Sequence, residues 1–169
     1  PQVSCDDGFR TPEDGPGSYV TWEVDKSDRQ DLHYLHGALH VFDAGHEVQK
    51  YTWCNTQVAL VDQIRSALDA GKFPLFVAEG KWQEKLARIQ HSNFLGRSYR
   101  SFAKIRGALF IFGHSLAEND DHILRLIDHG KMGPIFISLF GDVESNTAII
   151  SRAQRFKLNR KKNAPEVYY

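Results

Sequence analysis

Three histidines near the start of the chain, His33, His36 and His40, are the first side chains that could bind a metal ion or transfer a proton. On a helix they would lie along one face, an arrangement that suits metal binding. The aromatic and branched residues around them instead favour a strand that bends at Gly37, and on a strand His33 faces away from the other two. We therefore predict no metal site here. The alternative for each histidine is a buried, hydrogen-bonded side chain.

A second group, Gly113, His114 and Ser115, follows the apolar run of residues 108–112. That run lacks polar alternation, which is typical of a strand buried on both faces in a parallel sheet. Apolar residues then return at helical spacing, at Ile123, Leu124, Leu126 and Ile127. Because a glycine turn before a helix can present free backbone N–H groups to an anion, the pattern predicts a ligand-binding turn.

Carboxylates cluster between this turn and the helix, within residues 118–121. Asp120, Asp121 and the adjacent His122 suggest acid–base chemistry. Capping is the interpretation that we favour, because carboxylates at the N-cap and in the first turn stabilise the helix dipole. The same negative charge opposes a phosphate at this helix, so ribose hydroxyls are the better ligand for the turn.

Short apolar runs alternate with helical patterns along the chain. The patterns predict strands over residues 31–42, 73–78, 108–112 and 135–140, a hairpin arm over 47–53, and helices over 56–70, 81–104 (with a break at Gly96) and 146–157. This alternation predicts an α/β fold of three layers with a mainly parallel sheet over residues 31–169. Before it we expect an irregular segment or linker at residues 1–30, in which residues 21–24 could form a short strand. Gly37, Gly80, Gly113 and Gly141 follow strand-like runs, and one cleft at the sheet edge could collect them.

Composition excludes several classes of protein. The chain has 169 residues and a formal net charge of zero, so a single domain is expected, and no overall field favours nucleic acid or an anionic membrane. The basic residues Lys157, Arg160, Lys161 and Lys162 are typical of a solvated helix end, so we do not expect nucleic acid as a partner. No apolar run approaches the roughly 20 residues that cross a bilayer. Cys5 and Cys54 lack metal-binding spacing, which suits a reducing cytoplasm.

Three motifs in this order resemble the C-terminal part of a sirtuin domain, the silent-information-regulator type, which has a Rossmann-like fold. They are Leu35-His36-Gly37, residues 76–80 (FVAEG) and residues 109–116 (LFIFGHSL). The match covers roughly residues 31–140. It is closest in character to bacterial sirtuin-like families, many of which are described as domains of unknown function.

The resemblance implies that NAD is the substrate or ligand. His36 would act as a general base on a ribose hydroxyl while the nicotinamide bond breaks, a task that suits a neutral imidazole. Gly37, Gly113, His114 and Ser115 would line the cofactor site. Ser138 would stand where sirtuins usually set an asparagine against the adenosine ribose.

Departures from the sirtuin pattern change the expected activity. The zinc module of four cysteines is missing, since Cys54 is the only cysteine between the first two motifs, and His114 replaces threonine. Hydrolysis of NAD to nicotinamide and ADP-ribose is therefore expected rather than deacetylation. The N-terminal Gly-Ala-Gly loop and the Gln-Asn-x-Asp stretch are also missing, and the chain starts on Pro1. We expect a fragment that is inactive alone and is completed by an N-terminal portion or a second copy. The alternative is a non-catalytic nucleotide-sensing or assembly module.

Overall fold

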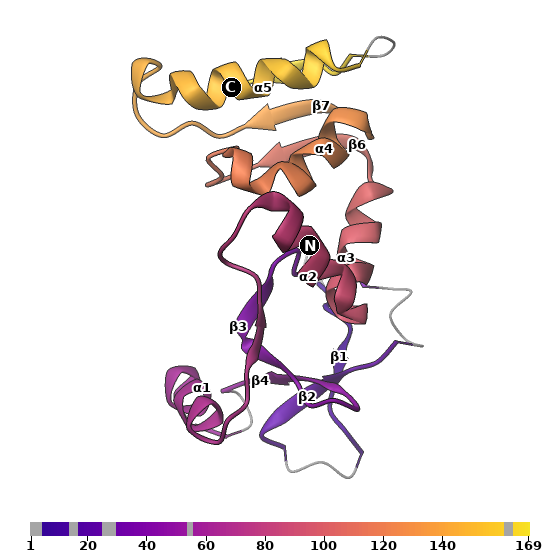
Figure 1. The fold of residues 1–169 in the computed structure, drawn as a ribbon, viewed down its shortest axis with the longest axis vertical. Helices are drawn as coiled ribbons and strands as arrows, with labels where there is room; N and C mark the ends of the chain where they lie inside the picture. Colours follow the sequence, from indigo (N-terminus) through magenta and orange to yellow (C-terminus); the bar gives the residue numbers. More distant parts are fainter. Residues whose placement is uncertain (1–4, 14–16, 25–29, 54–55, 161–163) are drawn as a thin grey trace. The chain divides into compact units, whose positions relative to one another are not determined.

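A computed structural model describes residues 5–13, 17–24, 30–53, 56–160 and 164–169 (Figure 1). Cys54 and the basic residues Lys161 and Lys162 lie outside the described residues. The chain divides into two units. Unit 1 comprises Pro1–Ala78 and His91–Ser98, and unit 2 comprises Glu79–Gln90 and Tyr99–Tyr169. Each unit has its own sheet. The described residues contain no helix that is long and apolar enough to cross a membrane.

Unit 1 is built on an antiparallel sheet of five strands in the order β1-β2-β4-β3-β5. The strands are β1 (Phe9–Arg10), β2 (Tyr19–Trp22), β3 (Gly37–Asp43), β4 (Val48–Tyr51) and β5 (Pro74–Phe76). The expectation of one mainly parallel sheet is wrong for this unit. The turn after β3 is the physical reason, because a connection this short can join only antiparallel strands. In that turn Ala44 N–H donates to Glu47 O at 2.9 Å.

The hairpin arm predicted over residues 47–53 is confirmed as β4, and β3 occupies the second part of the strand predicted over residues 31–42. Two strands, β1 and β2, lie within residues 1–30, where an irregular segment was expected, and β2 overlaps the short strand considered at residues 21–24. β2 pairs directly with β4, so this early segment is part of the sheet of unit 1. The expected domain boundary at residue 30 stays a prediction.

Aromatic packing forms the centre of unit 1. Phe94, at the start of α3 (Asn93–Ala103), is buried, and the rings of Phe9 and Trp22 meet it edge-on at centroid distances of 5.4 and 5.3 Å. Such edge-to-face pairs stabilise a core beyond the area that they bury. Three separate segments are held together by this one ring.

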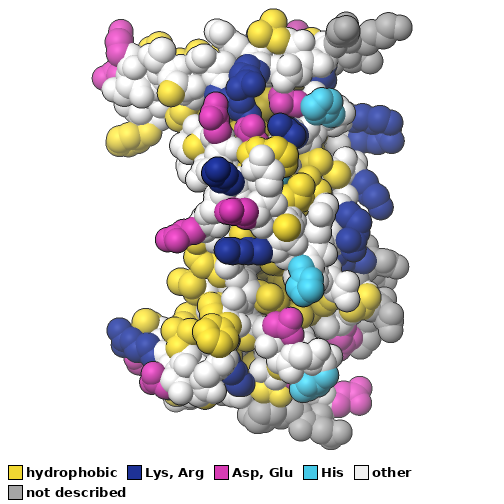
Figure 2. All heavy atoms as spheres, in the orientation of Figure 1, with side chains coloured by type: hydrophobic (Ala, Val, Ile, Leu, Met, Phe, Trp, Pro, Cys, Tyr) yellow, Lys and Arg dark blue, Asp and Glu magenta, His cyan; other side chains and the backbone are white. Residues whose placement is uncertain are grey.

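The helix α1 (Leu60–Asp69) lies within the span predicted at residues 56–70, but it buries less than its pattern implies. Its only buried side chains are Gln63 and Ala67, whereas Val61 and Leu68 are exposed. Hydrophobic side chains accordingly gather on the surface over α1 (Figure 2). An apolar helical face therefore predicted the helix correctly but not the burial of that face.

The long helix predicted over residues 81–104 is two helices, α2 (Trp82–His91) and α3. They separate at Ser92, not at Gly96. Gly96 is buried inside α3 and donates its N–H to Ser92 O at 2.8 Å. The Ser92 hydroxyl accepts the N–H of Leu95 at 3.4 Å, as a residue that caps a helix start does. A serine cap therefore sets the boundary.

Unit 2 has a parallel sheet in the order β6-β7-β8, formed by β6 (Arg106–Ile111), β7 (Lys131–Ile137) and β8 (Val167–Tyr168). The crossovers contain α4 (Asp121–His129) and α5 (Thr147–Leu158), each preceded by a short 3-10 turn, η2 (Glu118–Asp120) and η3 (Glu144–Asn146). The parallel pairing expected for the run at residues 108–112 and the helices on either side of β7 are confirmed here. The molecule as a whole is a mixed α/β protein.

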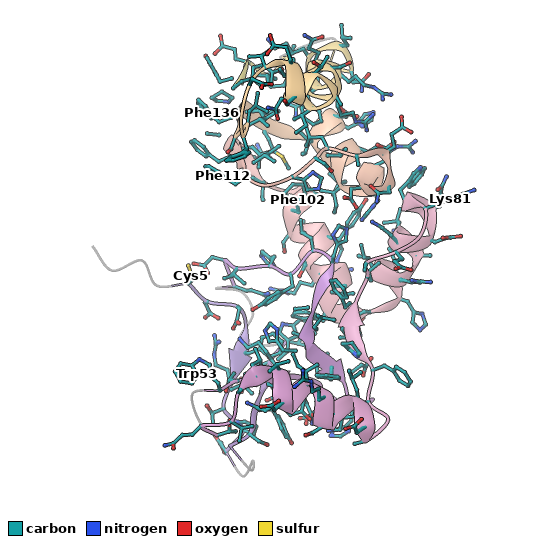
Figure 3. The ribbon with its side chains drawn as sticks, turned by 90° about the vertical axis from the view of Figure 1, so that its left-hand side faces the viewer. Cys5, Trp53, Lys81, Phe102, Phe112 and Phe136 are labelled. Atoms are coloured by element: carbon teal, nitrogen blue, oxygen red, sulfur yellow. The ribbon has the colours of Figure 1, made fainter. Side chains whose placement is uncertain are left out.

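The parallel sheet is buried on one face only. Leu109 and Ile111 of β6 pack against a core that also contains Leu124, Ile135 and Phe156. On the opposite face Phe110 is 59% exposed, and Phe112 beyond the strand end is 75% exposed. The Phe136 ring stacks on those of Phe110 and Tyr168 at centroid distances of 4.7 and 4.9 Å, and Phe112 and Phe136 point to the same side (Figure 3). The prediction of burial on both faces is therefore wrong within the described chain.

Gly37 has a role in the fold that no other residue can fill. Its φ is +74°, and a Cβ built on it would lie 1.8 Å from Leu75 O, the backbone of the neighbouring strand segment. Gly45 in the β3–β4 turn has a similar φ of +85° but nothing within 4 Å of such a Cβ. The two glycines share a backbone conformation and differ in the space around them.

Replacing Gly37 by alanine should therefore lower the free energy of unfolding by more than about 2 kcal/mol, because backbone strain and a backbone clash add. Gly45→Ala, the matched control, carries the strain alone and should cost about 1 kcal/mol. Urea denaturation followed by tryptophan fluorescence measures both. Equal unfolding midpoints for the two variants would contradict the close approach of β3 and β5.

Candidate functional site

The carboxyl ends of β6 and β7 lie side by side in unit 2. Ile111 pairs with Ile137, and the N–H of Ser138 donates to Ile111 O at 2.9 Å. Residues 112–117, the β6 loop, and residues 138–143, the β7 loop, therefore leave the sheet at the same edge. In open parallel sheets this edge is where ligands bind.

Left-handed backbone shapes the β6 loop at two positions. Gly113 has a φ of +64°, and no atom lies within 4 Å of a Cβ built there. Leu116 has a φ of +53°, which is unfavourable for a bulky residue, yet its side chain is only 2% exposed. Burial of the leucine holds the loop in a conformation that leaves the backbone at Gly113 open.

His114 connects this loop to the start of α4. Its Nδ1 accepts the N–H of Leu116 at 2.9 Å. The proton of the neutral imidazole must then sit on Nε2, which lies 3.4 Å from Asp120 Oδ2. Both ring nitrogens are thus engaged within the protein. His114 stays a predicted cofactor-binding residue, but these contacts favour a role in shaping the loop.

The other oxygen of Asp120 binds a lysine. Lys85 Nζ on α2 lies 2.9 Å from Asp120 Oδ1, and Lys85 is only 3% exposed. The next carboxylate, Asp121, pairs with the buried Arg152 of α5. A buried charge needs a partner of opposite sign, and here each of the two carboxylates has one.

These pairs change the interpretation of the acidic cluster. Asp120 is the N-cap residue of α4 and Asp121 stands in the first turn, as the sequence predicted. The Asp120 carboxylate, however, makes no capping hydrogen bond. It binds Lys85 and contacts His114 instead. Since Lys85 and Arg152 cancel the two charges, repulsion of a phosphate at this edge is weaker than the sequence suggests.

Asn146 holds the β7 loop. This side chain is 6% exposed, and its Nδ2 donates to Phe140 O at 2.9 Å and to Asp142 O at 2.7 Å. The loop turns at Gly141, whose φ is +84°. Asp142 Oδ1 accepts the N–H of Ser145 at 2.7 Å. Hydrogen bonds from the Ser145 side chain, and then from its backbone, lower the pKa of Asp142, which is therefore ionised at neutral pH.

The structure brings four of the predicted site residues together in unit 2 and places the other two in unit 1. Gly113, His114 and Ser115 lie in the β6 loop and Ser138 begins the β7 loop, all in unit 2, with both serines exposed. The remaining pair, His36 and Gly37, belongs to unit 1.

His36 lies before β3, not at the end of a strand, and its carbonyl accepts the N–H of Val77 at 2.9 Å. The neighbouring histidines are half-buried. Burial, and then the charge of Arg97, lowers the pKa of His33, and burial, and then Lys50, lowers that of His40. Both are therefore neutral near pH 7, and the buried-histidine alternative stays a prediction.

Four residues that shape this edge were not predicted from the sequence: Lys85, Asp142, Asn146 and Arg152. Lys85 and Arg152 carry no signal, because a lysine or arginine on an amphipathic helix is normally solvated. Asp142 did carry a signal in the sequence. It follows a glycine directly after an apolar strand, where dinucleotide-binding folds place an acidic residue. The described parts of both loops contain no lysine or arginine.

Replacing Asn146 by alanine should lower the free energy of unfolding by roughly 1–3 kcal/mol, because the β7 loop loses two hydrogen-bond donors from a buried side chain. Amide hydrogen exchange at residues 140–145 should accelerate at the same time. Asn119→Ala, which removes an exposed asparagine from η2, is the control and should leave both unchanged. An equal loss of stability in the two variants would show that Asn146 does not hold the loop.

Comparison with known proteins supplies a family but no activity. No curated protein and no solved structure matches the chain. One family model matches, and its description assigns no function. The resemblance to sirtuins stays a prediction. Because the match extends over residues 1–169, the chain belongs to the family described as Domain of unknown function (DUF4917).

Proposed function

We propose that this protein binds NAD through its ADP-ribose part, at the edge formed by the β6 and β7 loops. The observation that carries the proposal is the position of two residues on one parallel strand pair. Gly113 turns the chain after the first strand, and Asp142 follows the second strand, at the same edge. Dinucleotide-binding folds use this combination: a glycine for close approach of the backbone, and a carboxylate for the ribose hydroxyls.

The groups at this edge can each make a specific contact with a nucleotide. The open backbone at Gly113 lets the ligand approach closely. Asp142 is ionised, and its carboxylate has acceptor capacity beyond the bond to Ser145, so it can accept both hydroxyls of a ribose. The exposed hydroxyls of Ser115 and Ser138 donate to ribose or phosphate oxygens. The lack of lysine and arginine in the two loops favours recognition of ribose over a phosphate clamp.

The proposal extends to hydrolysis of NAD through the resemblance to sirtuins. Water would replace nicotinamide on the ribose carbon, giving nicotinamide and ADP-ribose. His36 would accept a proton from a ribose hydroxyl as the bond breaks. Support for this step comes from the ordered motifs alone, since His36 belongs to unit 1 and the proposed nucleotide edge to unit 2.

A sensing function without catalysis is the second candidate. The observation in its favour is that the described residues of unit 2 offer a carboxylate and a glycine turn at one edge, which are groups that bind a nucleotide. The protein would then only bind the nucleotide, and a change in the conformation of unit 2 on binding would be the signal.

Replacing Asp142 by asparagine should weaken NAD binding about tenfold, because a charged acceptor for the ribose hydroxyls is lost. The wild-type chain should bind NADP at least about tenfold more weakly than NAD, since the 2′-phosphate would face a carboxylate, and the variant should lose this preference. Calorimetric titration with both nucleotides measures the two effects.

Glu144→Gln is the matched control, because it removes an exposed carboxylate two residues further on. It should leave both affinities unchanged. If it reproduces the Asp142→Asn result, overall charge rather than a specific contact determines the preference.

Replacing His36 by alanine decides between hydrolysis and sensing. The test uses the intact protein. If it releases nicotinamide from NAD, measured by liquid chromatography, His36→Ala should abolish release with little change in thermal stability, and His46→Ala, which alters an exposed histidine, should not. Binding of NAD by the intact protein without product favours sensing. Undiminished turnover in His36→Ala would refute the role of the histidine, and absence of any nucleotide binding would refute both functions.

A further inference from the structure

We infer that Lys85 of α2 is a positioning residue for the nucleotide site: through Asp120 and His114 it holds the β6 loop, and it cancels the charge that would otherwise repel a phosphate-bearing ligand. The loop-holding part stands on contacts within unit 2 alone. The part about ligand affinity rests on the proposed function.

Lys85 is buried, and this burial ties it to Asp120. Lys85 is 3% exposed, and its Nζ lies 2.9 Å from Asp120 Oδ1. An ammonium group with so little access to water needs a charged or strongly polar partner. Lys85 and Asp120 therefore constrain each other, although 35 positions separate them in the sequence.

Asp120 in turn contacts His114 of the β6 loop. With Oδ1 held by Lys85, Oδ2 faces His114 Nε2 at 3.4 Å. A carboxylate at this position favours the tautomer that carries its proton on Nε2, which leaves Nδ1 as an acceptor. That acceptor takes the N–H of Leu116 at 2.9 Å. The tautomer and the left-handed conformation of Leu116 thus support one another.

Lys85 also cancels the negative charge of Asp120. Asp120 and Asp121 stand directly after the β6 loop, and Lys85 and Arg152 cancel their charges. Removing Lys85 leaves a net negative charge on the partly buried Asp120, which water screens less than an exposed charge. An anionic ligand should then lose more affinity than a neutral ligand of the same shape.

The test measures the affinity of the chain for ADP-ribose, which is anionic, and for adenosine, which is neutral, by chemical-shift titration. In Lys85→Met the ratio of ADP-ribose to adenosine affinity should fall about fivefold or more, as expected for one added charge near the phosphates. The double variant Lys85→Met/Asp120→Asn should restore the ratio, because it removes both charges. Lys81→Met, an exposed lysine at the start of the same helix (Figure 3), is the control and should leave the ratio unchanged.

A second readout needs no ligand. In the wild-type chain the nitrogen shifts of the His114 ring should show the tautomer with its proton on Nε2. Amide exchange at Leu116 should accelerate more than tenfold in Lys85→Met and stay unchanged in Lys81→Met. If the wild-type chain binds neither ligand, the proposed function fails, and the tautomer and exchange data still decide whether Lys85 holds the loop.

Three results would overturn the inference. Unchanged exchange at Leu116 in Lys85→Met would show that the loop does not depend on the lysine. An equal loss of ADP-ribose and adenosine affinity would show a merely structural effect without a role for charge. If Lys85→Met does not fold, Asp120→Asn replaces it: the affinity ratio should then rise above that of the wild type, and a fall would contradict the electrostatic step.

Discussion

Parallel pairing of β6 with β7 is the constraint on which the candidate site depends. In a parallel pair both strands end at the same edge, so the chain must return through a crossover, and the loops before the two helices emerge together. The glycine of one loop and the carboxylate of the other thereby lie at the same edge of the sheet, although they are far apart in the sequence. An antiparallel arrangement, as in unit 1, would put such loops at opposite edges.

Buried charges determine what this edge can bind. Two carboxylates after the β6 loop would exclude a phosphate if they faced water unpaired, and the structure gives each a buried cation from another helix. Buried ion pairs add little net stability on average, because desolvation offsets their attraction. Their effect here lies in the conformation of the β6 loop and in the charge at the edge of the sheet, where Asp142 is exposed and ionised.

Unit 1 illustrates how one motif supports two explanations. The His36-Gly37 pair matches the sirtuin pattern, yet Gly37 is required by the close approach of the Leu75 carbonyl whether or not a nucleotide binds. The glycine therefore adds no independent support for a cofactor site. His36 contributes to the same fold through its backbone carbonyl, which accepts the N–H of Val77.

Local patterns by themselves determined the elements that local forces dictate: the strand at residues 108–112, the helices on either side of β7, the hairpin arm after residues 43–45 and the position of Asp120 at a helix start. They gave the wrong sheet for unit 1 and the wrong burial for Phe110, because pairing direction and the covering of a face depend on segments distant in sequence. The partners of Asp120 could not be found in this way either. Lys85 and Arg152 look like solvated residues of amphipathic helices, and only the tertiary structure, by removing them from water, makes each charge require the other.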